Sequence, residues 1–167
     1  MLIESIRKRR SIRVYKSDPI SDEMVEEVIR AGKIAPSAHG ADALEFIVVK
    51  KQEMKEAIFV IVGQEVEQDF VKEAPVIIIP VATHEAKLPV QDIAVASENM
   101  FLQATALGLG SVWKNISPEF EGKIKTLLGI PDNAKVINLI PLGFSGEEKE
   151  EHTEDVSVTE KIHMEKW

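Results

Sequence analysis

Apolar residues recur at helical spacing in several stretches of the chain. The clearest stretch is residues 90–107, where a stripe of apolar side chains follows one face of a helix. Elsewhere the helix ends are marked locally: Ser21 is an N-cap followed by two acidic residues, and Gly32 is a residue that can end that helix. The sequence therefore predicts helices over residues 2–9, from Ser21 to Gly32, over 51–66 and 90–107, and from Pro118 to Leu128.

Short runs of β-branched and aromatic residues lie between these helices. They predict strands at residues 46–49, 76–81, 111–113 and 135–142. Pro80 lacks a backbone N–H, so we expect it at a sheet edge or near a strand end. Helices and strands are mixed along the chain, with no repeat and no low-complexity linker. Residues 1–167 are therefore expected to form a single α+β domain.

Several function classes lack the residues they need. The chain has no cysteine, and its four histidines have no metal-ligand spacing. Serine-hydrolase and phosphate-loop motifs are absent from the sequence. The longest apolar run, residues 74–82, is too short to cross a bilayer, and no signal peptide is evident. We expect a cytoplasmic protein with no metal and no membrane partner.

Charge is unevenly distributed. Six cations against one acid give residues 1–16 a charge of +5, which leaves −13 for the rest of a chain whose net charge is −8. A nucleic-acid-binding protein carries a broad basic surface, so nucleic acid is not an expected partner. A concentrated basic segment on an acidic chain is typical of a local anion site.

The candidate anion site is the basic segment, residues 9–13. Arg9, Arg10 and Arg13 offer guanidinium groups to a phosphate, and Ser11 offers a hydroxyl. Each charged hydrogen bond contributes about 1.5–3 kcal/mol net, and micromolar binding needs roughly 8 kcal/mol. Burial of the ligand's rings would have to supply the remainder. A solvated basic helix end with no ligand is the alternative, and the residues alone leave both open.

Four blocks in order resemble the nitroreductase-like family of FMN-dependent oxidoreductases. The first is residues 9–13 with Tyr15, and the second is Ala35-Pro36-Ser37-Ala38-His39 followed by residues 46–49. The third runs from Asp92 to Trp113 and includes Gly108-Leu109-Gly110. The fourth comprises residues 128–131 and 139–143. The last seven residues, 161–167, are similar to the ends of compact family members.

The resemblance implies a fold, an assembly and a site. The fold is α+β, with a central, mainly antiparallel sheet flanked by helices. The assembly is an intertwined homodimer with FMN at the interface and a C-terminal arm, ending at Trp167, that wraps the partner. The FMN-contacting residues that it implies are Arg9, Arg10, Ser11 and Arg13 at the phosphate and ribityl chain, Pro36, Ser37 and Ala38 along the ring, and Gly110, Ser111, Trp113 and Gly143 nearby.

The sequence departs from the family pattern in two places. Gly40, Asp42, Ala43 and Leu44 stand where the family carries Asn and Gln-Pro-Trp. An acid at 42 near the flavin would disfavour an anionic reduced flavin by like-charge repulsion. The tail also lacks the usual phosphate-binding cation after a proline, and within residues 147–155 only Lys149 is a candidate.

The resemblance implies an NAD(P)H-dependent FMN oxidoreductase. By a ping-pong cycle it would pass a hydride through the flavin to a small electron-poor acceptor, such as a nitroaromatic or a quinone. No catalytic acid or base is required. Two alternatives stay open: a flavin-binding member with little reductase activity, and a regulatory module that binds another phosphorylated ligand.

Overall fold

The computed structural model describes residues 2–40, 42–63, 68–153 and 158–167. Its longest element is helix α5, Pro89–Ala106, which matches the longest helical pattern in the sequence. The other helices are α1 (Glu4–Lys8), α2 (Asp22–Lys33), α3 (Gln52–Val62), α4 (Phe70–Glu73) and α6 (Pro118–Leu128), with short 3-10 turns at Ala38–Gly40 and Thr159–Lys161. The short helix α4 has no counterpart among the predicted helices. The predicted 51–66 helix is too long, because α3 ends at Val62 with Gly63 as its C-cap; residues 64–67 lie outside the described residues.

An antiparallel sheet forms the centre of the molecule. Its strands are β1 (Leu44–Val49), β2 (Val76–Ala82), β3 (Gly110–Ser111), β4 (Lys114–Asn115) and β5 (Asn138–Gly143). Their order is β1-β2-β5-β3, and β4 also pairs with β5. Pro80 lies in the interior strand β2, opposite Phe46 of β1, but the β2–β5 pairing covers only Val76–Ile78. A proline is tolerated because it lies near the strand end, beyond that pairing.

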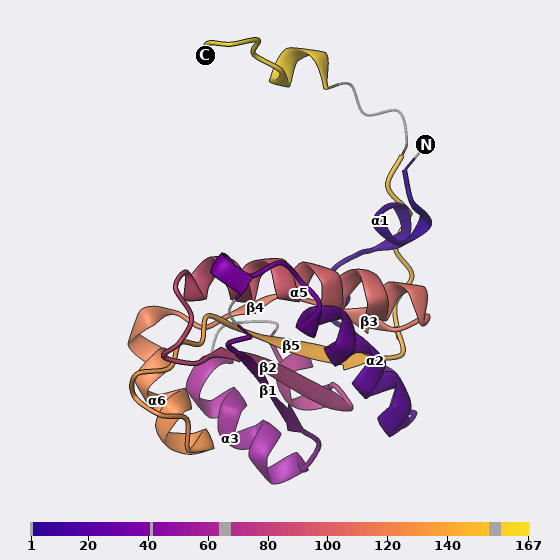
Figure 1. Ribbon diagram of the computed structural model, residues 1–167. Coiled ribbons are helices and arrows are strands. Elements are labelled where there is room, and N and C mark those ends of the chain that lie inside the picture. The colour runs from indigo at the N-terminus through magenta and orange to yellow at the C-terminus, as the bar shows by residue number, and fades with distance from the viewer. Residues whose placement is uncertain (1, 41, 64–67, 154–157) are drawn as a thin grey trace.

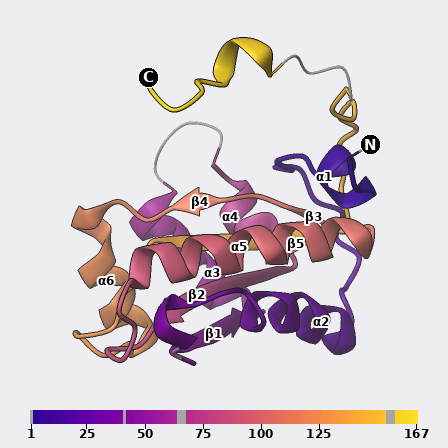
Figure 2. The same cartoon turned by 45° about the horizontal axis from the view of Figure 1, so that its top comes forward.

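Helices cover both faces of this sheet (Figures 1 and 2). Ile77, Ile79 and Val81 of β2 pack with α3, α4 and α6 on one face. Val76 and Ile78 of the same strand pack with α2 and α5 on the other. Alternate side chains of a strand point to opposite faces, so a strand covered on both sides is a continuous apolar run. The run at residues 76–82 has this pattern.

Most of the predicted helix ends are confirmed. The Ser21 hydroxyl accepts a hydrogen bond from the Met24 N–H at 3.3 Å, as an N-cap should. Gly129 ends α6 with a φ of 69°, in the left-handed region that glycine favours. The predicted end at Gly32 is wrong, because α2 continues to Lys33. Gly32 is buried in the helix, and a Cβ there would lie 2.8 Å from the Met100 side chain of α5. Its small size allows α2 and α5 to approach closely.

Two predicted strands are shorter than expected. Within residues 111–113, only Ser111 is in a strand, because β3 ends there and β4 begins after Trp113. Strand β5 begins at Asn138, while Lys135 makes only an isolated bridge with Ala82. Trp113 is therefore a connecting residue between two short strands, with more freedom to present its ring outward.

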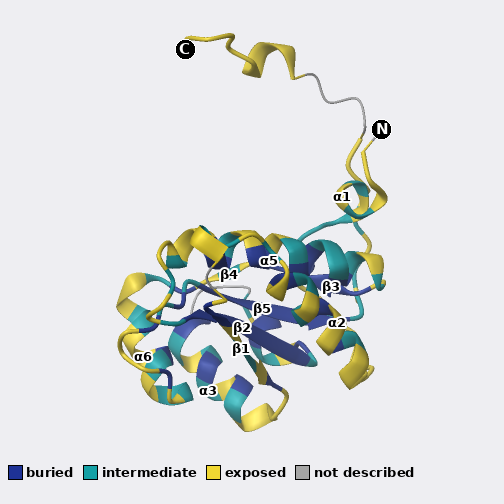
Figure 3. Ribbon diagram, in the orientation of Figure 1, coloured by how far each residue is buried: buried dark blue, intermediate teal, exposed yellow. Residues whose placement is uncertain are grey.

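The two chain ends project from the body on the same side (Figure 1). Helix α1 has no buried residue, and every residue of the terminal arm, 158–167, is exposed (Figure 3). Ile162, Met164 and Trp167 are among the exposed apolar residues of the arm. None of the helices in the described ranges combines the length and the apolar content that crossing a bilayer requires.

Candidate functional site

The basic segment lies between the sheet and the tail that follows β5, residues 144–153. Ser11 forms a parallel bridge with Ser111 of β3, and the Ile12 N–H donates to the Ser111 carbonyl at 3.0 Å. From the other side, Lys149 Nζ donates to the Ser11 carbonyl at 2.6 Å. Main-chain and side-chain hydrogen bonds therefore fix the segment in an extended course at the end of the sheet. An extended course also lets side chains on either side of Ser11 project away from the sheet.

Basic side chains converge on a pocket of about 260 Å³. This basic pocket is lined by Arg9, Arg10, Ser11, Arg13, Lys149 and His152. All four residues predicted to contact the phosphate and ribityl chain line it, and two tail residues join them. The structure thus brings the residues predicted to contact the phosphate together in one pocket.

The cations of the basic pocket differ in their acidic partners. Arg9 Nε lies 3.9 Å from Glu98 of α5, and Lys149 Nζ lies 3.4 Å from Glu147. Among the described residues, neither the Arg10 nor the Arg13 guanidinium has a carboxylate within 4 Å. Two guanidinium groups without an acidic partner are suited to bind an external dianion.

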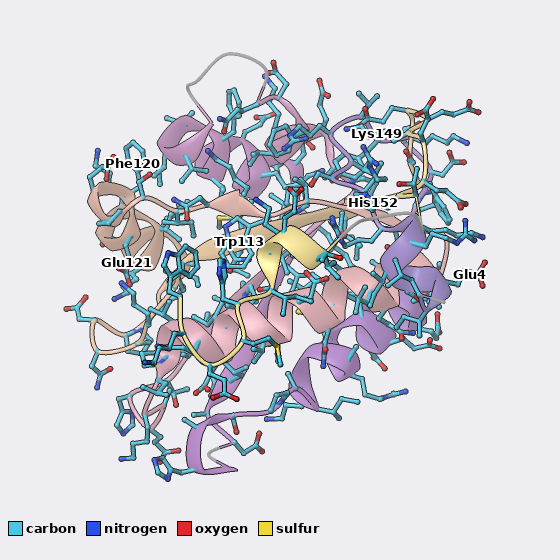
Figure 4. The ribbon with its side chains drawn as sticks, turned by 90° about the horizontal axis from the view of Figure 1, so that it is seen from above. Glu4, Trp113, Phe120, Glu121, Lys149 and His152 are labelled. Atoms are coloured by element: carbon cyan, nitrogen blue, oxygen red, sulfur yellow. The ribbon has the colours of Figure 1, made fainter. Side chains whose placement is uncertain are left out.

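The tail places its candidate cation, Lys149, beside the arginines of the basic segment. Lys149 is in the basic pocket although no proline precedes it in the tail. His152 is in the same pocket, and its N–H donates to the Arg7 carbonyl at 3.0 Å. Figure 4 shows Lys149 and His152 on the same side of the molecule as Glu4 of α1. Sequence reasoning missed His152 because a lone histidine in an acidic stretch carries no local signal of a site.

A second, less basic cavity adjoins the basic pocket and shares Arg10 and Lys149 with it. This groove has a volume of about 410 Å³. Its lining residues are Lys8, Arg10, Ile12, Thr105, Gly108, Leu109, Gly110, Ser145, Glu147, Glu148 and Lys149. The groove therefore offers apolar and backbone surface beside the cations, as a ligand with a phosphate and a less polar remainder requires.

The small-residue loop, residues 35–40, lies at the start of α5. The Ala38 N–H donates to Asp92 Oδ1 at 3.0 Å. Asp92 is only 3% exposed, and its Oδ2 is buried without a hydrogen-bond partner among the described residues. His39 and Gly40 both have positive φ, 58° and 67°. The buried Asp92 carboxylate therefore fixes the loop at the start of α5.

The loop and the basic pocket contact different parts of α5. Asp92 is in the first turn, whereas Glu98 and Thr105 mark where the basic segment and the groove meet the helix. These two positions lie about 9 and 20 Å along the axis from Asp92, each roughly a third of a turn away around it. Pro36, Ser37 and Ala38 therefore do not line the basic pocket of their own chain.

The remaining predicted contact residues have other packing roles. A Cβ at Gly110 would lie 2.8 Å from the Ile12 side chain, and one at Gly143 would lie 2.6 Å from Pro75 Cδ. Ser111 is buried beneath the basic segment. Trp113 is 37% exposed, with its ring edge-on to Phe101 at 6.5 Å, and lies nearer the centre of the molecule in Figure 4. A flavin contact remains a prediction for all four.

Three of the four residues that depart from the family pattern at 40–44 are accounted for by packing or pairing. Ala43 and Leu44 are buried in the core, 2% and 8% exposed. Asp42 forms an ion pair with Lys33 at the end of α2. That pairing reduces the negative field that Asp42 would exert on a nearby ligand. The described residues include no group of three or more His, Cys, Asp or Glu side chains that could hold a metal.

Comparisons with known proteins agree on one family. A family model described as "Nitroreductase family" matches residues 6–144. Two archaeal proteins, from Archaeoglobus fulgidus and Methanothermobacter thermautotrophicus, are provisionally named NADH dehydrogenase/NAD(P)H nitroreductase. Both are 37% identical over 99% of this chain, covering 98% and 87% of their own lengths respectively.

Solved structures agree with the sequence relatives. An FMN-dependent nitroreductase from Clostridium difficile superposes with a TM-score of 0.89 at 30% identity, over 99% of this chain and all of the other. An NADH oxidase from Clostridium acetobutylicum, also a provisional name, gives a TM-score of 0.88 at 30% identity, over 98% of this chain and 100% of the other. The α+β fold expected from the sequence is therefore confirmed.

Proposed function

Because the chain belongs to the nitroreductase family of oxidoreductases, we propose that it is an FMN-dependent enzyme that takes reducing equivalents from NAD(P)H. One observation carries the proposal: Arg10 and Arg13, without acidic partners among the described residues, share a pocket with Lys149 and Ser11. Such a pocket fits a phosphate dianion. A relative from Clostridium difficile is named an FMN-dependent nitroreductase, and one from Vibrio harveyi is named an NADPH-flavin oxidoreductase. Both names support FMN as the ligand that carries the phosphate.

The residues of this chain would bind and orient the cofactor. Arg10, Arg13 and Lys149 bind the phosphate, with Ser11 as a further donor. The groove beside them, with Ile12 and Leu109 in its wall, receives the less polar part and excludes water from it. FMN, when bound, would supply the chemistry of hydride transfer from NAD(P)H to a small electron-poor acceptor in a ping-pong cycle.

We further propose a homodimer in which the small-residue loop of one chain completes the pocket of the other. The loop and the pocket contact different faces of α5, so a single chain presents only part of the site. The projecting α1 and the terminal arm, with Ile6 and Trp167 exposed, are suited to pack on a partner. Each large apolar side chain buried there contributes about 1.5–3 kcal/mol. A single domain and a cytoplasmic location remain predictions.

The test is a flavin titration of the purified protein followed by anaerobic addition of NADH or NADPH. We expect FMN to bind more tightly than riboflavin, which lacks the phosphate, and the visible absorbance of the bound flavin to bleach on addition of a reduced nicotinamide. A protein that binds neither flavin would contradict the proposal.

A second candidate is a flavin-binding family member with little reductase activity. Asp42, in place of the family's amide, favours it, although the ion pair with Lys33 weakens that argument. The same experiment separates the two functions, since FMN that binds but is reduced by neither nicotinamide supports the second. A protein that binds inorganic phosphate but no flavin supports a regulatory module for another phosphorylated ligand.

A further inference from the structure

An acidic side chain lies where an anion site should exclude it. Glu147 lines the groove beside Arg10 and Lys149, yet a carboxylate near a phosphate weakens phosphate binding by like-charge repulsion. Its neighbour Glu148 lines the same groove but is more exposed. The two residues carry the same charge, so the difference between them lies in what their carboxylates contact.

The Glu147 carboxylate is turned toward the chain itself. Its Oε1 accepts hydrogen bonds from the Arg13 N–H at 2.5 Å and the Val14 N–H at 3.2 Å, and Oε2 lies 3.4 Å from Lys149 Nζ. No ion pair joins Glu148 to another side chain in the described ranges. Partial burial raises the pKa of Glu147, but the hydrogen bonds from Arg13, Lys149 and Val14 outweigh it and hold that pKa below its ordinary value.

These contacts are part of a longer pairing between residues 11–16 and residues 144–149. The Gly146 N–H donates to the Val14 carbonyl at 2.8 Å, and the Lys16 N–H donates to the Phe144 carbonyl at 2.9 Å. Tyr15 forms an antiparallel bridge with Ser145. Towards Ser11, the pairing depends on side chains, because Glu147 holds the backbone at Arg13 and Lys149 holds the carbonyl of Ser11.

We propose that Glu147 is a positioning residue for the phosphate site. Its carboxylate fixes the backbone of Arg13 and Val14 and the ammonium of Lys149, so that Arg13 and Lys149 line the same pocket. Its electrostatic cost is small, because N–H groups and an ammonium already surround the charge. This inference rests on the proposed binding of FMN, and it assigns the tail a structural part in that binding.

The experiment compares FMN and riboflavin affinities of the wild type with those of Glu147→Ala, Glu147→Gln and Glu150→Ala. We expect Glu147→Ala to bind FMN about tenfold more weakly, with riboflavin affinity unchanged, because only the phosphate contacts are disturbed. Glu147→Gln keeps an oxygen acceptor for both N–H groups and should restore most of the affinity. Glu150→Ala removes the same charge from an exposed residue that lines neither the groove nor the basic pocket, and it should leave both affinities unchanged.

A second readout needs no flavin. Amide hydrogen exchange at Arg13 and Val14 should accelerate in Glu147→Ala and stay near the wild-type rate in Glu150→Ala. Unchanged exchange, or FMN binding as tight as or tighter than wild type in Glu147→Ala, overturns the inference and leaves the proposed function intact. Should the alanine variant not fold, a tenfold gain in FMN affinity in Glu147→Gln overturns it instead, since that gain would show that the charge only repels. A wild type that binds no FMN overturns both proposals.

Discussion

The basic segment and the small-residue loop are both expected to contact FMN, but they are fixed in different ways. The basic segment is bonded along its length, to Ser111 of β3 on one side and to Glu147 and Lys149 of the tail on the other. The loop has one long-range side-chain hydrogen bond among the described contacts, from the Ala38 N–H to buried Asp92. The comparison indicates that phosphate recognition depends on a backbone segment held by several hydrogen bonds. Contact with the flavin ring depends on a loop of small residues held by one long-range side-chain hydrogen bond.

The largest effect should come from the guanidinium groups themselves. Arg13→Ala or Arg10→Ala should weaken FMN binding by about 1.5–3 kcal/mol, because each removes charged hydrogen bonds to the phosphate. Riboflavin affinity should change little. Lys16→Ala is the matched control, since it removes a nearby positive charge that does not line the basic pocket. Flavin fluorescence titrations measure the affinities of the wild type and the three variants. If both arginine variants bind FMN as tightly as the wild type, the phosphate assignment is refuted.

Gly110→Ala tests whether the course of the basic segment depends on β3. A Cβ at residue 110 would lie 2.8 Å from three atoms of the Ile12 side chain, and such overpacking costs about 1–3 kcal/mol. We expect lower thermal stability together with weaker FMN binding. Gly122→Ala in α6 is the control, because nothing lies within 4 Å of a Cβ there. If Gly110→Ala unfolds at the wild-type temperature, the close approach of Ile12 does not constrain the segment.

Asp92→Ala tests the loop, and its signature should differ from that of the arginine variants. It leaves the Ala38 N–H without its acceptor and should weaken FMN and riboflavin binding to a similar extent, by about 1 kcal/mol, because the ring contact is shared by both flavins. Asp92→Asn retains an oxygen acceptor and is the conservative comparison. A loss confined to FMN would place the loop at the phosphate and remove the distinction between the two regions.

The smallest effect concerns pH. The pKa of Glu147 is lowered in the folded protein, so its contribution to stability is complete above the ordinary value of 4.5 and is lost as the pH falls through the lowered pKa. Below pH 4.5 the unfolding free energy of the wild type should therefore decline more steeply than that of Glu147→Gln. Urea unfolding of both proteins across that range checks the sign. Parallel pH profiles would show that Glu147 does not bind its backbone partners as a charged group.

The sequence predicted most of the fold because its signals were local. Ser21 marked the start of α2, and the unbroken apolar run at residues 76–81 predicted a strand, which the structure covers on both faces. The predicted helix end at Gly32 was wrong because that glycine allows close packing against Met100, which is far away in the sequence. Local chemistry cannot distinguish a glycine needed for a turn from one needed for close packing.

The candidate site was predicted less completely, for the same reason. The arginines were identified because they cluster in sequence, and the structure places them in one pocket with Lys149. The roles of Asp92 and Glu147 were missed because their partners, Ala38 and Arg13, are 54 and 134 residues away. An acidic residue that fixes a distant backbone N–H has the same local pattern as one that is solvated.

The central claim is that each site combines the basic pocket of one chain with the small-residue loop of its partner. The most direct test is FMN stoichiometry in a mixed dimer of Arg13→Ala, which damages the pocket, and Ser37→Trp, which obstructs the loop. Each variant alone should bind little FMN at a concentration that saturates the wild type. In the mixed dimer one site receives both lesions and the other receives none, so we predict one FMN per dimer. A mixed dimer that binds no FMN would show that pocket and loop act within the same chain, and would contradict the account.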